Sequence, residues 1–170
     1  MKLLLIIGAV AVLITVTVLL GFSGKKVLKV GDPAPFFELK DQNNTTRRLT
    51  DYIGKRLVVY FFPKADTPGW IKEACGFRDI YGEYGKHDIT VLGISYDKPK
   101  ALLSFKNKYE LPFNFLCDND KSVSEQYGAG GIFVPSRKTF VIGPDGKIEK
   151  IYHNVNVNTH GEQILKDLTK

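Results

Sequence analysis

The sequence predicts an α/β domain with a mixed, twisted sheet flanked by helices. Apolar runs typical of buried strands alternate with segments typical of helices, and the last two expected strands flank a tight turn. The chain has 170 residues, of which 44% are hydrophobic and 25% are charged, as in ordinary globular proteins. About 145 residues remain after an N-terminal apolar segment, which is enough for one core.

Two apolar runs mark the expected central strands. Residues 56–63 (RLVVYFFP) and 88–97 (DITVLGISYD) are rich in β-branched and aromatic residues, which is typical of strands covered on both faces. A helix is expected from position 68 to about 84. Thr67 is its predicted hydroxyl N-cap, and Pro68 occupies the first helical position.

The alternation continues toward the C-terminus. Further helices are expected over residues 98–109, 121–127 and 160–168, and a short strand over 114–117. Residues 138–143 and 148–155 are expected to pair as a hairpin, because Pro144, Asp145 and Gly146 form a strong turn signal between them.

The N-terminus carries an uncharged apolar run from Leu3 to Phe22. Its 20 residues match the ~20 needed to span a bilayer, and the sequence after it is a poor match to a signal-peptidase site. We therefore expect a transmembrane anchor in residues 1–24, a tether in 25–30 and the folded domain in 31–170. A cleaved signal segment is the alternative.

Two arguments about the side of the membrane on which the domain lies conflict with each other. Lys25, Lys26 and Lys29 follow the run whereas Lys2 precedes it, which by the positive-inside rule places the domain in the cytoplasm. Anchored domains of similar folds often face outward. We expect the extracytoplasmic side, and the cytoplasmic side stays open.

Charge and cysteine content exclude several classes of protein. The net charge is +6, but the lysines are scattered and no basic stripe with interleaved aromatic residues appears, so nucleic-acid binding is not expected. Two cysteines argue against a disulfide-stapled scaffold. The three histidines lack the spacing of a metal site, and no metal, haem or flavin cofactor is expected.

The segment from Phe61 to Asp79, FFPKADTPGWIKEACGFRD, has the layout of an active-site loop that runs into a helix. Position 70 falls in the first helical turn, where unpaired N–H groups and the helix dipole favour an anion. A cysteine there would be a reactive thiolate of low pKa. The residue is Trp70 instead, and an indole has one N–H donor and no nucleophile.

These residues closely resemble the bacterioferritin comigratory protein type of peroxiredoxin, also called peroxiredoxin Q. That family's loop reads TPGCTKEACGFRD where this chain has TPGWIKEACGFRD. The likeness includes four further segments and covers about five-sixths of the chain: GDPAPFFELKDQ, VLGISYD, PSRKTFVIGPDGKI and the last helix. It implies a thioredoxin-like fold and reduction of hydrogen peroxide or alkyl hydroperoxides with a thioredoxin-like reductant, by a monomer or weak dimer.

The resemblance also implies roles for single residues. Trp70 stands at the position of the peroxidatic cysteine, and Cys75 at that of the resolving cysteine. Thr67 matches the threonine that bonds peroxide and thiolate, and Arg137 matches the arginine that polarises the O–O bond. Pro63 begins the family's loop. Cys117, at the end of an expected strand, is interpreted as a core thiol.

Three accounts of position 70 are open. The chain is a pseudo-enzyme that serves as a binding module on the membrane, or a redox sensor that works through Cys75 alone. In the third account the printed Trp70 replaces a cysteine or a selenocysteine, either because a UGA codon was read as tryptophan or because the nucleophile was substituted.

Overall fold

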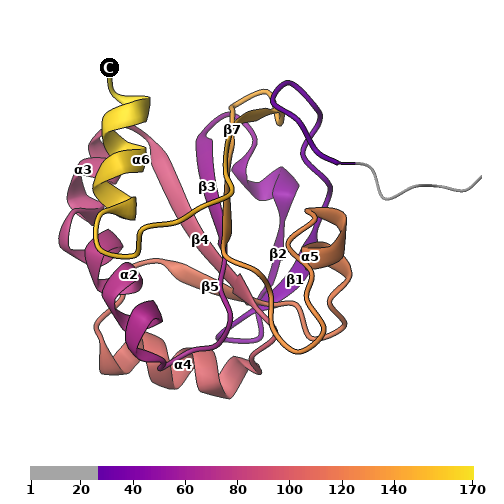
Figure 1. The fold of residues 1–170 in the computed structure, drawn as a ribbon, viewed down its shortest axis with the longest axis vertical. Coiled ribbons are helices and arrows are strands. Elements are labelled where there is room, and N and C mark those ends of the chain that lie inside the picture. The colour runs from indigo at the N-terminus through magenta and orange to yellow at the C-terminus, as the bar shows by residue number, and fades with distance from the viewer. Residues whose placement is uncertain (1–26) are drawn as a thin grey trace, which may run out of the picture.

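The computed structural model describes residues 27–170, which form one mixed sheet of seven strands with helices on both faces (Figure 1). The strands are β1 (Glu38–Asp41), β2 (Thr46–Arg48), β3 (Arg56–Phe61), β4 (Ile89–Ser95), β5 (Asn114–Cys117), β6 (Lys138–Ile142) and β7 (Ile148–Tyr152). The helices are η1 (Leu49–Tyr52), α2 (Pro68–Asp79), α3 (Tyr81–Lys86), α4 (Pro99–Lys108), α5 (Ser122–Gln126) and α6 (His160–Leu168).

The strand order is β2-β1-β5-β4-β3-β6-β7. The three central strands β5, β4 and β3 are parallel, and the outer pairings are antiparallel. The expected α/β fold with a mixed sheet is therefore confirmed. The expected hairpin of β6 and β7 is also present, although β7 ends at Tyr152, three residues before the predicted limit.

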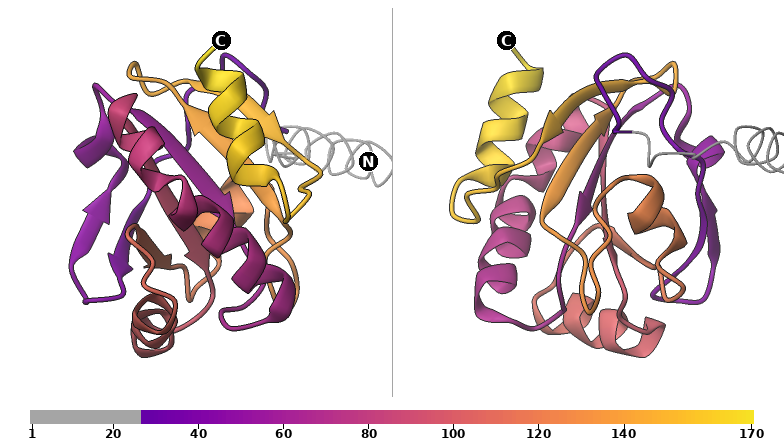
Figure 2. Two further views of the ribbon diagram at one scale, coloured as in Figure 1. Left: turned by 90° about the vertical axis from the view of Figure 1, so that its left-hand side faces the viewer. Right: turned by 45° about the vertical axis from the view of Figure 1, so that its right-hand side comes forward.

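The central strand β3 divides the core into two layers. Val58 and Tyr60 face a cluster that holds apolar residues of α2, α3, α4 and α6. Val59 and Phe61 face a second cluster, which holds residues of α5 and η1. Figure 2 shows α2 and α6 side by side on one side of the sheet, away from α5. A strand buried on both faces explains the unbroken apolar run that the sequence shows.

The helix expected over residues 68–84 is in fact two helices. α2 ends at Asp79, and Ile80 adopts φ −116° and ψ 12°, outside the regular helical range. Gly82 and Gly85 follow in α3, and glycine is a poor helix former, so a single long helix is not favoured. The break lets the Tyr84 hydroxyl donate a 2.7 Å hydrogen bond to the carbonyl of Gly161 in α6.

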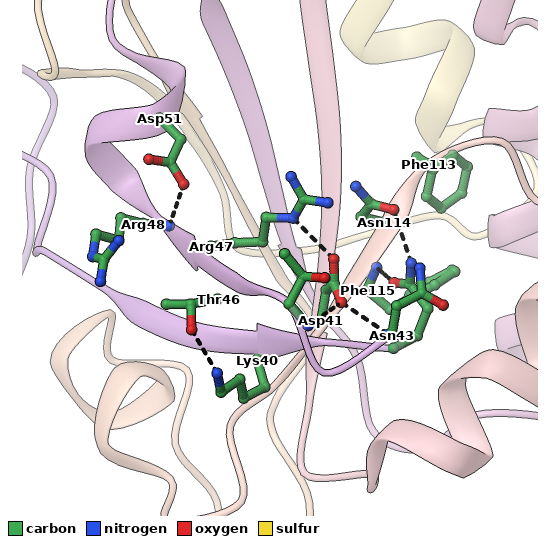
Figure 3. A network of polar contacts seen from close by, with 12 residues as sticks. Lys40, Asp41, Asn43, Thr46, Arg47, Arg48, Asp51, Phe113, Asn114 and Phe115 are labelled. Carbon is green, nitrogen blue, oxygen red and sulfur yellow. Dashed lines mark hydrogen bonds and ion pairs between the residues drawn. The ribbon is translucent and has the colours of Figure 1, made fainter.

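The sequence analysis missed the hairpin of β1 and β2. Its turn is held by Asp41, whose Oδ1 accepts hydrogen bonds from the N–H groups of Asn43 (2.8 Å) and Thr45 (3.0 Å), and whose Oδ2 pairs with Arg47 at 2.9 Å (Figure 3). Asn44 has φ 62°, a left-handed conformation that asparagine tolerates. The consecutive residues Asn43 and Asn44 were the signal from which the sequence could have predicted this turn.

The expected membrane segment, Leu3–Phe22, lies outside the described residues. Within residues 27–170, no helix has both the length and the apolar character that crossing a bilayer requires.

Candidate active site

The site lies where β3 runs into α2. The chain leaves the sheet after Phe61 and enters the helix at Pro68, with Thr67 in an extended conformation at the N-cap position. The predicted hydroxyl cap is wrong, because the Thr67 hydroxyl donates to the carbonyl of Lys64 at 3.2 Å. The Thr67 carbonyl accepts the N–H groups of Trp70 and Ile71, both at 2.9 Å. Position 70 is thus in the first turn, as expected.

Trp70 is fully buried, with none of its surface exposed. Its indole lies parallel to the ring of Phe62, with centroids 4.1 Å apart and planes 1° apart. The ring of Tyr60 lies 4.9 Å away in the same cluster. Aromatic contacts at this spacing are favourable beyond the area they bury. The indole Nε1 has no hydrogen-bond partner among the described residues. Position 70 is therefore filled by an apolar ring.

Arg137 reaches the same turn from the other side of the site. In the sheet, Phe61 of β3 pairs with Lys138 of β6, so the residue before Lys138 stands beside the end of β3. A Cβ atom placed on Gly69 would lie 3.0 Å from Nη2 of Arg137. A side chain at position 69 would require the guanidinium to shift by a few tenths of an ångström, so Gly69 favours its close packing on the first turn of α2. The structure therefore brings Arg137 and position 70 together.

Glu73 is a further member of the site, one turn after Trp70. Its side chain is 3% exposed, and its Oε2 has no hydrogen-bond partner in the described part of the chain. Burial raises the pKa of the Glu73 carboxyl to about 7, and the positive charge of Arg137 acts in the opposite direction. The sequence analysis assigned no role to Glu73, which lies in α2.

The two cysteines occupy different environments, and both are free. Cys75 is half-buried in α2, five residues after Trp70. A rise of 1.5 Å per residue separates the two positions by about 7.5 Å along the helix axis, which exceeds the Cα separation of a disulfide. Any bond between positions 70 and 75 thus requires α2 to unwind. Cys117 is buried in β5, and burial raises the pKa of its thiol to about 12. Both observations agree with its interpretation as a core thiol.

Two residues that the sequence analysis did not single out hold the loops of the site. Asp97, after β4, accepts a 2.8 Å hydrogen bond from the N–H of Ala65, in the loop that starts at Pro63. The hydroxyl of Tyr96 lies 3.2 Å from the N–H of Gly131, in the loop that leads to Arg137. The turn after β4, which holds Tyr96 and Asp97, therefore forms hydrogen bonds to both loops. The signal lay in the segment VLGISYD, which the sequence analysis assigned to a strand and to the family resemblance without a role for Tyr96 or Asp97.

Comparisons with known proteins agree on the kind of protein. Residues 30–151 match the family described as "AhpC/TSA family". The chain is 42% identical over 149 residues to a "Putative peroxiredoxin bcp" of Coxiella burnetii, covering 81% of this chain and 97% of the relative. It is 43% identical over 146 residues to "Peroxiredoxin Bcp" of Escherichia coli K12, covering 81% and 94%.

Solved structures give the same result. A cysteine-to-serine mutant of PrxQ from Xylella fastidiosa superimposes with a TM-score of 0.80 at 29% identity, covering 84% of this chain and 96% of that one. The "Peroxidoxin BcpB" of Mycobacterium tuberculosis superimposes with a TM-score of 0.77 at 32% identity, covering 83% and 96%.

The raised pKa of Glu73 predicts a pH-dependent stability. Between its ordinary pKa of 4.5 and its folded value of about 7, the folded protein keeps a proton that the unfolded chain has lost, so stability falls as pH rises through this window. Glu73→Gln replaces the carboxyl with an amide that does not titrate, so the variant lacks this fall in stability. The free energy of unfolding of Glu73→Gln minus that of wild type should therefore increase by up to about 3 kcal/mol between pH 4.5 and pH 7. Urea titrations at each pH measure this difference.

The control is Glu162→Gln, at an exposed carboxyl on α6. It should keep the pH dependence of wild type. If the Glu73→Gln profile runs parallel to that of wild type, Glu73 is ionised throughout the window and its assigned environment is wrong.

The contact of Asp97 with Ala65 predicts a local effect. Asp97→Ala leaves the Ala65 N–H without its acceptor, so we expect faster amide exchange at Ala65 by NMR and a loss of stability of about 1–2 kcal/mol. Asp97→Asn keeps an acceptor oxygen and should retain most of the protection. Equal protection of Ala65 in wild type and Asp97→Ala would show that the hydrogen bond does not hold the loop.

Proposed function

We propose a function from the premise that this chain belongs to the AhpC/TSA family, as a peroxiredoxin of the Bcp/PrxQ type. Homologues in this family are peroxidases. The proposed function is reduction of hydroperoxides at a site centred on position 70, with a chalcogen nucleophile that the printed sequence lacks. The carrying observation is the packing of Arg137 on Gly69, immediately beside that position.

The geometry supports a role for each neighbour of position 70. A thiolate or selenolate there would gain from the N–H groups of the first turn and from the guanidinium of Arg137. Its attack on a peroxide oxygen breaks the O–O bond, which releases water or an alcohol and leaves a sulfenic or selenenic acid. The guanidinium would stabilise the negative charge that develops on the oxygens. The Thr67 hydroxyl would turn from Lys64 toward the substrate.

Cys75 would complete the cycle. Its thiol attacks the oxidised atom at position 70, water leaves, and a bond forms between the two residues. Because about 7.5 Å of helix rise separates them, the first turns of α2 must open before this step. A thioredoxin-like dithiol would then reduce the bond and become a disulfide itself. A related structure from Xanthomonas campestris carries the printed description "Alkyl Peroxide Reduction Activity", which supports alkyl hydroperoxides as substrates here.

One observation favours a second candidate function. Trp70 is completely buried and stacks flat on Phe62, so the indole fits its surroundings well. A domain that keeps this ring would be a catalytically inactive peroxiredoxin, acting in binding or in redox sensing through Cys75.

In either function, we propose that residues 1–24 anchor the domain to the extracytoplasmic side of a membrane. We propose that the domain is a monomer or a weak dimer.

Trp70→Cys distinguishes the two functions. Loss of a large buried ring costs about 3–5 kcal/mol, but it removes the side chain that fills position 70. We expect the variant to consume peroxide with a thioredoxin system, and the pKa of its new thiol to lie well below the free value of about 8.5. One equivalent of peroxide should remove two free thiols, which thiol titration measures.

Three variants serve as controls. Trp70→Phe should be inactive, and Trp70→Cys with Cys75→Ser should lose one thiol and form no internal disulfide. Trp70→Cys with Arg137→Gln should react more slowly and have a higher thiol pKa. A folded Trp70→Cys protein that neither consumes peroxide nor pairs with Cys75 would refute the peroxidase and leave the inactive domain.

A further inference from the structure

The exposed apolar side chains of the domain gather in two segments. Seven large hydrophobic residues are exposed in the part of the chain that the structure describes, and only Ile53 lies outside residues 27–36 and 132–134. Ile132 and Phe133 are 81% and 86% exposed. We call the other six the apolar patch: Val27, Val30, Phe36, Ile132, Phe133 and Val134.

Both segments border Tyr127, at the end of α5. The Tyr127 hydroxyl donates a 2.8 Å hydrogen bond to the carbonyl of Pro35, next to Phe36. Val27 and Leu28 line a cavity of about 220 Å³ together with Tyr127 and Gly128, where the loop to Ile132 begins. Figure 2 shows the N-terminal segment and α5 on the side of the sheet opposite α6. The patch therefore belongs to one side of the domain.

The loop that carries Ile132 and Phe133 is fixed at its base. Ser136 donates its N–H to the carbonyl of Ala129 at 2.8 Å, which closes the loop. Lys121 donates to the carbonyl of Ile132 at 2.7 Å, and the Tyr96 hydroxyl contacts Gly131. The loop therefore holds its apolar side chains exposed to water. Clustered exposed apolar residues mark surfaces that bind a partner.

The occupant follows from the chain that precedes the patch. The predicted membrane run ends at Phe22, and Val27 is five residues later, within about 17 Å even when the link is fully extended. The membrane anchor that we propose for residues 1–24, on which this inference rests, would hold the patch close to a bilayer. Lys29, Lys121 and Lys138 lie beside the patch, with the carboxylates of Asp32 and Glu125 among them, so the lysine ammonium groups can contact the headgroups of anionic lipids.

We propose that the apolar patch docks on the membrane surface that the N-terminal run enters. Ile132 and Phe133 insert among the acyl chains near the headgroups, and the lysines contact anionic phospholipid. The domain is then held in one orientation on the bilayer rather than moving freely at the end of its tether.

The test uses the full chain in vesicles of phosphatidylcholine and phosphatidylglycerol. In a Cys75→Ser background, a nitroxide is attached to Ile132→Cys, or to Ile53→Cys as the matched exposed control, since Cys117 is buried. Power saturation compares collisions with oxygen, which concentrates in lipid, and with a water-soluble nickel chelate. We expect the Ile132 label to lose nickel collisions and gain oxygen collisions, while the Ile53 label stays accessible to nickel.

Adding Phe133→Asp should return the Ile132 label to water. Equal nickel accessibility at positions 132 and 53 would overturn the proposal. So would an Ile132 label shielded from both reagents and coupled to a second spin, because a second copy of the chain would then cover the patch. Extraction of the full chain from the vesicles by carbonate would overturn it as well, since the tether would be absent.

Discussion

The pairing register of β3 with β6 is the constraint on which the candidate site depends. Phe61 pairs with Lys138, so Arg137 must stand beside the point where the chain leaves β3 and turns into α2. The burial of β3 on both faces holds this edge in place, and the missing side chain of Gly69 lets the guanidinium reach the first turn. The arrangement of the candidate site thus follows from sheet geometry before any residue at position 70 is considered.

Trp70 alters the chemistry of this arrangement without disturbing the fold. The indole at position 70 is an apolar ring that stacks on Phe62, so the positive end of the helix and Arg137 face no negative charge from this position. The remaining acidic group is Glu73, which burial holds partly protonated near neutral pH. The fold is therefore preserved by packing, while the electrostatic features that suit a thiolate persist beside it.

The sequence predicted the parts of the fold that have strong local signals. Arg56–Phe61 reads as a buried strand because both faces are covered, and Pro144–Gly146 reads as a turn because few other conformations suit it. It missed the β1–β2 hairpin, since strands of four and three mostly polar residues show no alternation. Asp97 escaped notice because its partner Ala65 is 32 residues away, and such contacts depend on the tertiary fold.

The emission of Trp70 tests most directly the central claim that a buried indole fills position 70 of the candidate site. Trp70 is the only tryptophan in the chain, so the fluorescence is unambiguous. Full burial against Phe62 and an unpartnered Nε1 predict the blue-shifted emission of an apolar environment, with acrylamide quenching that stays low until the protein unfolds. Red-shifted emission that acrylamide quenches readily in the folded protein would contradict the account.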